Sequence, residues 1–221
     1  MRIVFIRHGH PDYTRDCLTE LGRKQAAAAA QRVSGEGISR IFSSTNGRAL
    51  ETAGFTADLL GLEVEGCDFM REISWGSLPS PWELVDAWVA SGEPLMDAGW
   101  EEAPGFAANP RLLTCVRQKA EAADAWLAEL GYVREGAYYR VREEVRTEVT
   151  VAAFGHGGET SAFLSRIFNL PFPFVCAACG ADFTGVTIVQ LPCRPGELVT
   201  PRFEIMNDAR HIAGGKIAYG Q

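Results

Sequence analysis

The chain has 221 residues, of which 47% are hydrophobic and 22% charged, with a formal net charge of −7. This composition is typical of a globular protein and supplies enough residues for one sizeable domain, while the negative charge argues against a general nucleic-acid binder. No apolar run reaches the roughly 20 residues of a membrane span, and the apolar start at 1–6 is too short for a signal peptide, so we expect no membrane association and a cytoplasmic location.

Strand-like and helix-like segments alternate along the first third of the chain. Ile3–Ile6 is wholly apolar, as expected of a strand buried on both faces of a parallel sheet. We predict a helix over Thr19–Val33 with the threonine as its cap, and a second strand at Ile41–Ser43. A second helix is predicted over Asn46–Leu60, capped by its asparagine, and Glu63-Val64 resembles a short strand.

The pattern loosens from about residue 77 to 110, where three tryptophans (Trp82, Trp88 and Trp100) and several prolines surround one short helical patch. This segment is predicted to be an insertion with the character of a lid. Regular alternation then returns. The later predicted elements are a helix at Arg111–Leu130, strands at Tyr138–Val141 and Val149–Phe154, a helix that Pro171 ends, and strands at Phe183–Leu191 and Arg202–Ile205.

Strand, loop and helix repeated in this way predict a single α/β domain over 1–221. We expect a three-layer sandwich with a mostly parallel central sheet and helices on both faces. In such sheets, ligands bind at the carboxyl ends of the strands.

Histidine and arginine side chains follow three of the predicted strands. Arg7-His8-Gly9 comes directly after the first strand, and Gly155-His156-Gly157 comes directly after another. Arg48 lies in the first turn of the helix after a third strand. If these strands are parallel, the four side chains meet at one edge of the sheet, where they form a candidate anion site.

This set of residue types suits a phosphoryl group. Two guanidiniums can each make paired hydrogen bonds to its oxygens, and a neutral imidazole can attack phosphorus to form a phosphohistidine. The cationic side chains supply the electrostatic stabilisation, so no metal and no cofactor is expected. Glu72 is the candidate that would donate a proton to the leaving oxygen.

The motifs resemble, in order, those of the histidine phosphatase superfamily, the phosphoglycerate mutase-like group. The matching segments are Arg7-His8-Gly9, Leu18–Ala26, Ser43–Ala53, Arg71–Gly76, Phe154–Gly158 and Asn207–Ile212. The resemblance implies the following roles: His8 as nucleophile, Glu72 as proton donor, His156 as a further catalytic group, and Arg7, Arg48, His156 and the Gly157 N–H as phosphate-binding groups. His211 is expected to support the site from behind.

The loop after His8 departs from the family pattern. Many relatives carry Glu-Thr there, followed by an asparagine that contacts phosphate, whereas this chain has residues His10 to Thr14. Thr14 is a candidate for the phosphate contact. His10 is either a partly exposed loop residue or a substrate contact at the rim of the pocket.

The leading interpretation is a phosphatase that acts on a small phosphorylated metabolite. The alternatives are a phosphoglycerate mutase-like phosphoryl transfer, a phosphoprotein phosphatase, and a non-catalytic phospholigand-binding protein. The single lysine in residues 214–221 favours the phosphatase over the mutase, and a homodimer is compatible with the sequence. The Cys176/Cys179 pair lacks the second pair or histidines of a zinc site, and all six cysteines are expected to be reduced thiols.

Overall fold

A computed structural model describes residues 1–93, 99–145 and 147–212 of the chain. Two sequence predictions fall partly or wholly outside this part. The tail at 214–221, which favoured a phosphatase, lies outside the described residues, and so does the stretch 94–98 within the predicted insertion.

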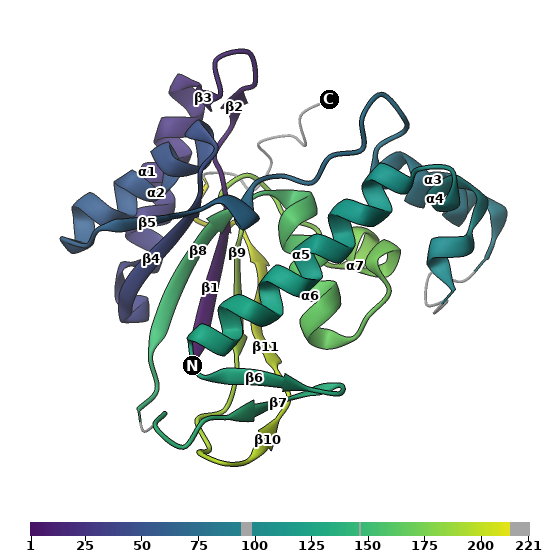
Figure 1. The fold of residues 1–221 in the computed structure, drawn as a ribbon. Helices are drawn as coiled ribbons and strands as arrows, with labels where there is room; N and C mark the ends of the chain where they lie inside the picture. Colours follow the sequence, from purple (N-terminus) through teal and green to yellow (C-terminus); the bar gives the residue numbers. More distant parts are fainter. Residues whose placement is uncertain (94–98, 146, 213–221) are drawn as a thin grey trace.

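The centre of the molecule is a six-stranded sheet in the order β11-β9-β1-β8-β4-β5 (Figure 1). Its strands are β1 (Arg2–Arg7), β4 (Ile38–Ser44), β5 (Val64–Cys67), β8 (Thr150–Gly155), β9 (Val186–Gln190) and β11 (Arg202–Asp208). The pairs β1/β8, β8/β4 and β4/β5 are parallel, and β9 runs antiparallel to both of its neighbours. The predicted mostly parallel sheet is confirmed.

Two small sheets lie outside the main one, and most of their strands were not predicted. They consist of β10 (Leu198–Val199), β7 (Tyr138–Val141) and β6 (Tyr132–Glu135), and of the hairpin β2 (Pro11–Asp12) and β3 (Cys17–Leu18). Of these, only β7 was predicted. Strands β2, β3 and β10 have two residues each, too few for an alternating pattern to show in the sequence. The four-residue β6 was missed although it is as long as β7.

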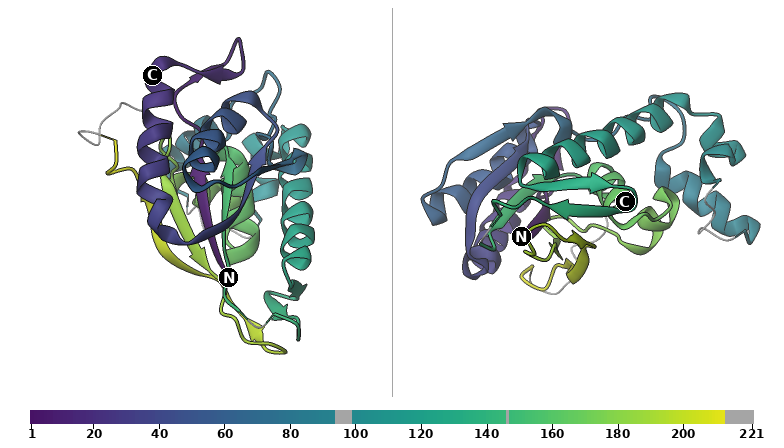
Figure 2. Two further views of the ribbon diagram at one scale, coloured as in Figure 1. Left: turned by 90° about the vertical axis from the view of Figure 1, so that its left-hand side faces the viewer. Right: turned by 60° about the horizontal axis from the view of Figure 1, so that its bottom comes forward.

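Helices cover both faces of the main sheet, as the left view of Figure 2 shows. Helices α1 (Glu20–Val33) and α2 (Gly47–Leu60) lie on one face, and α5 (Pro110–Glu129), α6 (Gly157–Phe168) and α7 (Phe172–Ala178) on the other. Single turns of 3-10 helix lie at η1 (Ser34–Glu36), η2 (Asp68–Met70) and η3 (Trp100–Glu102). The helix α7 was not predicted. Pro171, interpreted as the end of the preceding helix, is the residue that precedes α7.

Successive side chains of β1 point to opposite faces of the sheet and so contribute to the apolar core on each face. Ile3 and Phe5 point to the face of α5 and α6, where the Phe5 ring lies 5.1 Å from that of Phe163. Val4 and Ile6 point to the opposite face, against the alanines of α2. All four side chains are buried, and each contributes roughly 1.5–3 kcal/mol by leaving water.

The first two helices differ in how they begin. Thr19 Oγ1 accepts the Gly22 N–H at 3.1 Å, which confirms the predicted cap of α1. Asn46 precedes α2 as predicted, but its side chain makes no capping hydrogen bond. The Gly47 N–H donates instead to Asp16 Oδ2 at 2.8 Å, so the capping carboxylate comes from the β2–β3 loop.

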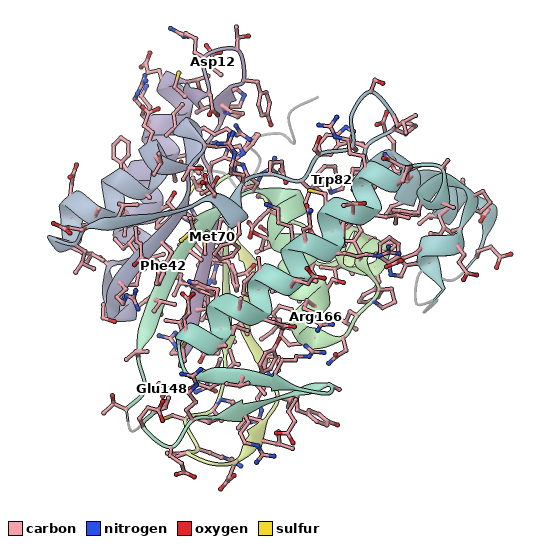
Figure 3. All side chains as sticks on the ribbon, in the orientation of Figure 1. Asp12, Phe42, Met70, Trp82, Glu148 and Arg166 are labelled. Carbon is pink, nitrogen blue, oxygen red and sulfur yellow. The ribbon has the colours of Figure 1, made fainter. Side chains whose placement is uncertain are left out.

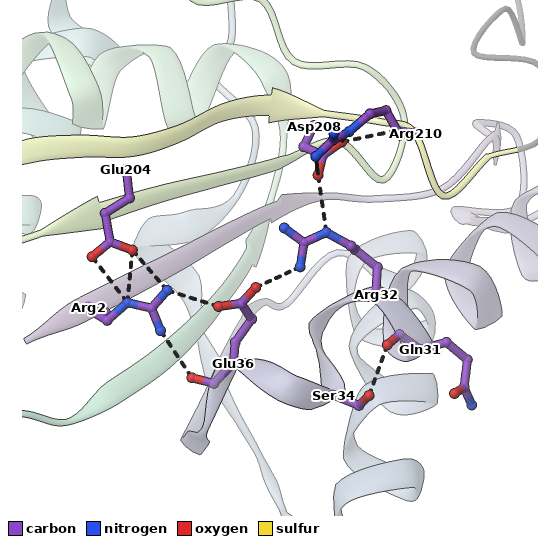
Figure 4. Close-up of polar contacts among 8 residues, drawn as sticks. All are labelled: Arg2, Gln31, Arg32, Ser34, Glu36, Glu204, Asp208 and Arg210. Carbon is purple, nitrogen blue, oxygen red and sulfur yellow. Dashed lines mark hydrogen bonds and ion pairs between the residues drawn. The ribbon is translucent and has the colours of Figure 1, made fainter.

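A chain of ion pairs ties the amino end of β1 to α1 and β11 (Figure 4). Arg2 pairs with Glu36 at 2.8 Å, and Glu36 pairs with Arg32 at 2.6 Å. Arg32 in turn contacts Asp208 at 3.1 Å, and Arg210 shares the same carboxylate. The network is partly buried, so these pairs are screened less than isolated surface pairs.

The predicted insertion contains α3 (Pro81–Ser91) and α4 (Pro104–Ala107), which project away from the sheet in the right view of Figure 2. A capping box between Ser80 and Glu83 starts α3. Trp88 and Trp100 pack on Phe106 with ring centroids 5.8 and 5.3 Å apart, and α3 also contacts α7. The aromatic residues thus build a satellite core.

Within the described residues, no one helix is long and apolar enough to cross a membrane, although α6 and α7 pass that test jointly as a pair bent by 120°. All six cysteines carry free thiols, and burial raises the pKa of Cys176 and of Cys179. The described side chains include no group of three His, Cys, Asp or Glu arranged to hold a metal ion.

Candidate active site

The parallel pairing of β1 and β8 places the two motif histidines side by side. Arg7 and Gly155 are register partners, so His8 and His156 are the first residues beyond each strand. The His8 N–H donates to Gly155 O at 3.0 Å, and the two imidazole centroids are 5.1 Å apart. Both rings are at most 1% exposed. The structure therefore brings together the two histidines that the sequence predicted.

Arg48 lies between the two rings. Its Nε is 3.3 Å from His8 Nε2, and its Nη2 is 3.1 Å from His156 Nδ1. Because a guanidinium can only donate, both of these ring nitrogens must be unprotonated. The protons are then on His8 Nδ1, which donates to Gly9 O at 2.8 Å, and on His156 Nε2, which donates to Ser44 Oγ at 2.9 Å. The lone pair of His8 Nε2 faces the guanidinium.

Both imidazoles are held neutral. Burial, together with the charge of Arg7, lowers the pKa of His8 to about 3. Burial also lowers the pKa of His156, and His8 and Arg48 lower it further. At neutral pH, His8 therefore has the free lone pair that a nucleophile needs.

Arg7 supplies the second guanidinium. It stacks on the Phe183 ring at 4.3 Å from the centroid, and its Nη1 donates to Ala181 O at 2.6 Å. Its Nε is buried and has no hydrogen-bond partner among the described residues. A buried donor without a partner is costly unless a ligand satisfies it, so Arg7 and the neighbouring Arg48 form a site suited to an anion.

Glu72 lies at the amino end of α6. Its Oε1 accepts the N–H groups of Ile73 and Glu159, each at 2.9 Å, and its Oε2 is 3.5 Å from the Gly158 nitrogen. Burial raises the pKa of Glu72, although these N–H groups and Arg7 act in the opposite direction. A carboxyl group with a raised pKa is suited to donate a proton.

Glu159 is a buried carboxyl group that sequence analysis missed. Burial raises its pKa to about 8, with Lys119 opposing the shift. Its Oε2 accepts the His156 N–H at 3.4 Å and the Thr160 hydroxyl at 3.1 Å. The spacing of three residues from His156, typical of a capping box, is the signal that could have identified it.

The loop after His8 places Tyr13, rather than Thr14, beside the site. The Tyr13 ring lies 6.5 Å from the His8 ring, and the Arg48 guanidinium lies 5.4 Å from its centroid. Thr14 is exposed, and its N–H donates to Asp12 Oδ1 at 3.1 Å. The proposed phosphate contact of Thr14 stays a prediction that no contact in this loop supports.

His10 is engaged with the start of α1. Its Nδ1 lies 3.0 Å from Thr19 Oγ1, and its N–H donates to Gln25 Oε1 at 2.6 Å. Its ring lies 5.5 Å from that of Phe183. Of its two interpretations, a substrate contact and a loop residue, these bonds favour the second.

Asp16 is a further residue that sequence analysis missed. It forms an ion pair with Arg48 and also caps α2 through Gly47. Partial burial opposes its ionisation, but the Gly47 N–H and Arg48 lower its pKa overall. No motif marks this position, because its role arises from how the β2–β3 loop lies against α2.

Two motif glycines, Gly9 and Gly22, allow the segment after His8 to lie directly against the start of α1. A Cβ on Gly9 would lie 2.6 Å from Gly22 O, and a Cβ on Gly22 would lie 2.2 Å from His10 O. The segment that follows His8 and the first turn of α1 can approach this closely only because neither residue has a side chain.

His211 lies behind the histidine segment. Its Nε2 is 3.1 Å from Thr184 Oγ1, and the Thr184 N–H lies 3.1 Å from Arg7 O and 3.3 Å from His8 O. It therefore contacts the backbone of the site through one intermediate residue, the arrangement expected of a supporting group. Gly157 begins α6, and its N–H stays a predicted phosphate donor.

Comparisons with known proteins agree with this geometry. Residues 3–200 match the family model of the histidine phosphatase superfamily (branch 1). The probable phosphoglycerate mutase GpmB of Yersinia pestis is 44% identical over 87 residues, a match that covers 35% of this chain and only 40% of that relative.

Two solved structures are similar over nearly their whole length. A phosphoserine phosphatase from Entamoeba histolytica in complex with phosphoserine has a TM-score of 0.65 at 20% identity, covering 96% of this chain and 98% of that chain, and shows likeness of fold alone. A mycobacterial glucosyl-3-phosphoglycerate phosphatase with inorganic phosphate has a TM-score of 0.60 at 25% identity, covering 96% and 99%. The family match, which spans most of the chain and includes both histidine segments, shows that this protein belongs to the histidine phosphatase superfamily.

Proposed function

We propose that the protein hydrolyses a small phosphomonoester through a covalent phosphohistidine at His8. The observation that carries this proposal is the neutral, buried His8 whose Nε2 lone pair faces Arg48. The Nε of Arg7, which is buried and has no hydrogen-bond partner within 1–93, 99–145 and 147–212, supplies a second cationic donor. The two guanidiniums supply the positive charge that stabilises a transferring phosphoryl group, and the neutral imidazole supplies the nucleophile.

In the first step, the phosphoryl group binds to Arg7 and Arg48 and takes up the hydrogen bond that Arg48 makes to His8. The Nε2 lone pair attacks phosphorus in line, and a P–N bond forms while the P–O bond to the leaving group breaks. Glu72 donates its proton to the leaving oxygen, so the product departs as an alcohol. The hydrogen bond from His8 Nδ1 to Gly9 O holds the ring in place throughout.

In the second step, a water molecule attacks phosphorus and the P–N bond breaks. The Glu72 carboxylate accepts one proton from the water, which restores the acid for the next cycle. The electron pair of the broken bond returns to His8 Nε2, and inorganic phosphate leaves. Both charge stabilisation and proton transfer are carried by side chains, so we expect activity without a metal or another cofactor.

A small phosphorylated metabolite is the proposed substrate class, in preference to a phosphoprotein. The Trp82 side chain lies against Gly157 at the site, and the Tyr13 ring lies near Arg48. Both side chains therefore lie close to the groups that would bind the phosphoryl group, where we expect them to leave little room for a folded protein substrate. The names of the structural neighbours, two phosphatases of small molecules, support the same class.

A mutase is the second candidate, and the match to a probable phosphoglycerate mutase favours it. It shares the first step, but the phosphoryl group then returns to a second hydroxyl of the substrate rather than to water. Turnover in ¹⁸O-labelled water separates the two, because hydrolysis places one labelled oxygen in the released phosphate, whereas a mutase forms an isomer without label.

The test is chemical trapping of the intermediate. Rapid acid-free quenching with a ³²P-labelled monoester should yield a phosphoprotein that is stable to alkali and labile to acid. We expect the label on the wild-type protein and on a His10→Ala control, and no label on His8→Ala. Full phosphatase activity in His8→Ala would contradict the proposal, and tight phosphate binding without turnover in the wild type would favour a non-catalytic phospholigand-binding protein.

A further inference from the structure

Three aromatic side chains, Tyr13, Phe183 and Trp82, lie around the two guanidiniums, and we call them the aromatic mouth. The rings of Tyr13 and Phe183 lie 6.5 and 5.6 Å from that of His8. Tyr13 is 66% exposed, although it is a large and mostly apolar residue. A ligand bound through its phosphoryl group to the arginines would extend past these rings.

Trp82 comes from the predicted insertion at 77–110 and is the second residue of α3. A Cβ on Gly157 would lie 3.4 Å from Trp82 Cζ2 and 3.7 Å from Arg7 Cζ, so both side chains lie over the same Cα atom. In Figure 3, Trp82 lies on the side of α3 that faces the central sheet. The Trp75 ring meets it edge to face, with centroids 5.8 Å apart at 87°. The insertion thus supplies one wall of the site.

Acidic side chains already lie beside both arginines before a substrate binds. Arg48 is paired with Asp16. Burial lowers the pKa of Arg7, and Glu72, then Tyr13 and Asp182, oppose that shift from nearby. A phosphomonoester adds close to two further negative charges. We expect the phosphoryl group to occupy both arginines, so that a carboxylate on the leaving group would find no free guanidinium there and would lie near the acidic side chains of Asp16, Glu72 and Asp182.

We propose, on the basis of the phosphatase function above, that the leaving group of the substrate is a flat apolar alcohol, of the aryl or arylalkyl class, which packs against Trp82 and Tyr13. Such a group gains apolar contact with the aromatic mouth and brings no charge to it. A carboxylated alcohol, such as the serine part of the phosphoserine in the related Entamoeba histolytica structure, lacks both advantages. Trp82 is the specificity-determining residue.

The experiment compares phosphate esters whose leaving alcohols are similarly basic, so that a difference in kcat/KM does not come from the intrinsic reactivity of the P–O bond. Benzyl phosphate and ethyl phosphate form such a pair, and O-phosphoserine adds a carboxylate. We expect kcat/KM for benzyl phosphate to exceed that for ethyl phosphate by about tenfold, which corresponds to about 1.4 kcal/mol, and O-phosphoserine to be the poorest of the three.

The matched variants are Trp82→Ala and Trp88→Ala, two tryptophans of the same helix. Trp88 packs on Phe106 in the satellite core. We expect Trp82→Ala to bring the benzyl-to-ethyl ratio close to one, Trp82→Phe to restore most of it, and Trp88→Ala to leave it unchanged. Equal ratios in the wild type and Trp82→Ala, or a preference for O-phosphoserine, would overturn the proposal.

Binding of phosphonates separates this inference from the proposed function, because these analogues are not hydrolysed. Calorimetry of the wild type should show tighter binding of benzylphosphonate than of methylphosphonate, and the difference should be lost in Trp82→Ala. This preference without turnover of any ester would refute the phosphatase function and leave the mouth supported. Turnover without a preference for the benzyl compounds would refute the proposal about the leaving group and leave the phosphatase function standing.

Discussion

Asp16 and Arg48 form an ion pair in which one carboxylate serves two structural purposes. It neutralises the guanidinium next to His8, and it accepts the N–H of Gly47 at the start of α2. The charge of the proposed phosphate site and the stability of α2 therefore depend on the same side chain.

Asp16→Asn should separate these two effects. The amide oxygen can still cap α2, while the negative charge that competes with phosphate is removed. We expect inorganic phosphate to inhibit Asp16→Asn at several-fold lower concentration than the wild type. Asp16→Ala should in addition lower the free energy of unfolding by about 1 kcal/mol, through loss of the cap. Unchanged phosphate inhibition in Asp16→Asn would show that the ion pair does not compete with the ligand.

The dependence of the rate on pH should reflect a neutral nucleophile and a protonated acid. With its pKa lowered to about 3, His8 keeps its lone pair down to a pH at which a free histidine is fully protonated. The raised pKa of Glu72 should retain its proton to a higher pH than an ordinary carboxyl group, and kcat should fall as pH rises through that value.

Glu72→Gln tests the acid directly. It should slow an alkyl phosphate by about 100- to 10,000-fold, and slow an activated aryl phosphate far less, because a good leaving group departs without a proton. The basic limb of the pH profile should vanish with the variant. If both esters are slowed equally, Glu72 does not act on the leaving oxygen.

Arg48→Ala should reduce kcat/KM about 100- to 1000-fold, as expected for loss of a buried charged donor to the transferring group. Arg48→Lys should recover only part of this, because an ammonium cannot contact both histidines as the planar guanidinium does. Arg40→Ala is the matched control, since Arg40 on β4 is half exposed and pairs with Glu65 on the edge strand β5. A loss below threefold in Arg48→Ala would place Arg48 outside the reacting centre.

Glu159 should make stability depend on pH. Its pKa is about 8 in the folded protein and ordinary in the unfolded chain, so its contribution is complete at low pH and is lost as pH rises towards 8. Between about pH 6.5 and 8, this group should lower the free energy of unfolding by at most about 2 kcal/mol. His8 and His156 are neutral in the folded protein and take up protons on unfolding mainly below about pH 6.5. They therefore do not oppose the decline in stability between pH 6.5 and 8.

Denaturant unfolding at several pH values checks this expectation. Glu159→Gln should remove the decline between those two pH values. Glu20→Gln, at an exposed position paired with Lys24, should keep it. A decline of the same size in Glu159→Gln would assign it to other groups.

Much of the candidate site could be predicted because its residues follow strands that have a strong apolar pattern. β1 and β8 are both recognisable from short, continuous apolar runs, and once they are parallel neighbours, His8 and His156 must lie together. The same argument applies to Arg48, which lies in the first turn of α2, the helix that follows β4. The ion pair of Asp16 and the capping bond of Glu159 could not be predicted from such runs. Asp16 lies 32 residues from Arg48, in a loop between two strands of two residues each.

The sequence by itself determined the α/β class, the mostly parallel sheet and the histidines and arginines at its carboxyl edge, because strand hydrophobicity and the motif positions are local properties. Only the tertiary structure decided that Asp16 caps α2 in place of Asn46 and that Tyr13, rather than Thr14, lies at the site. It alone decided that Trp82 of the insertion lies over Gly157. Each of these relationships joins segments that are distant in the chain, and packing across that distance sets them.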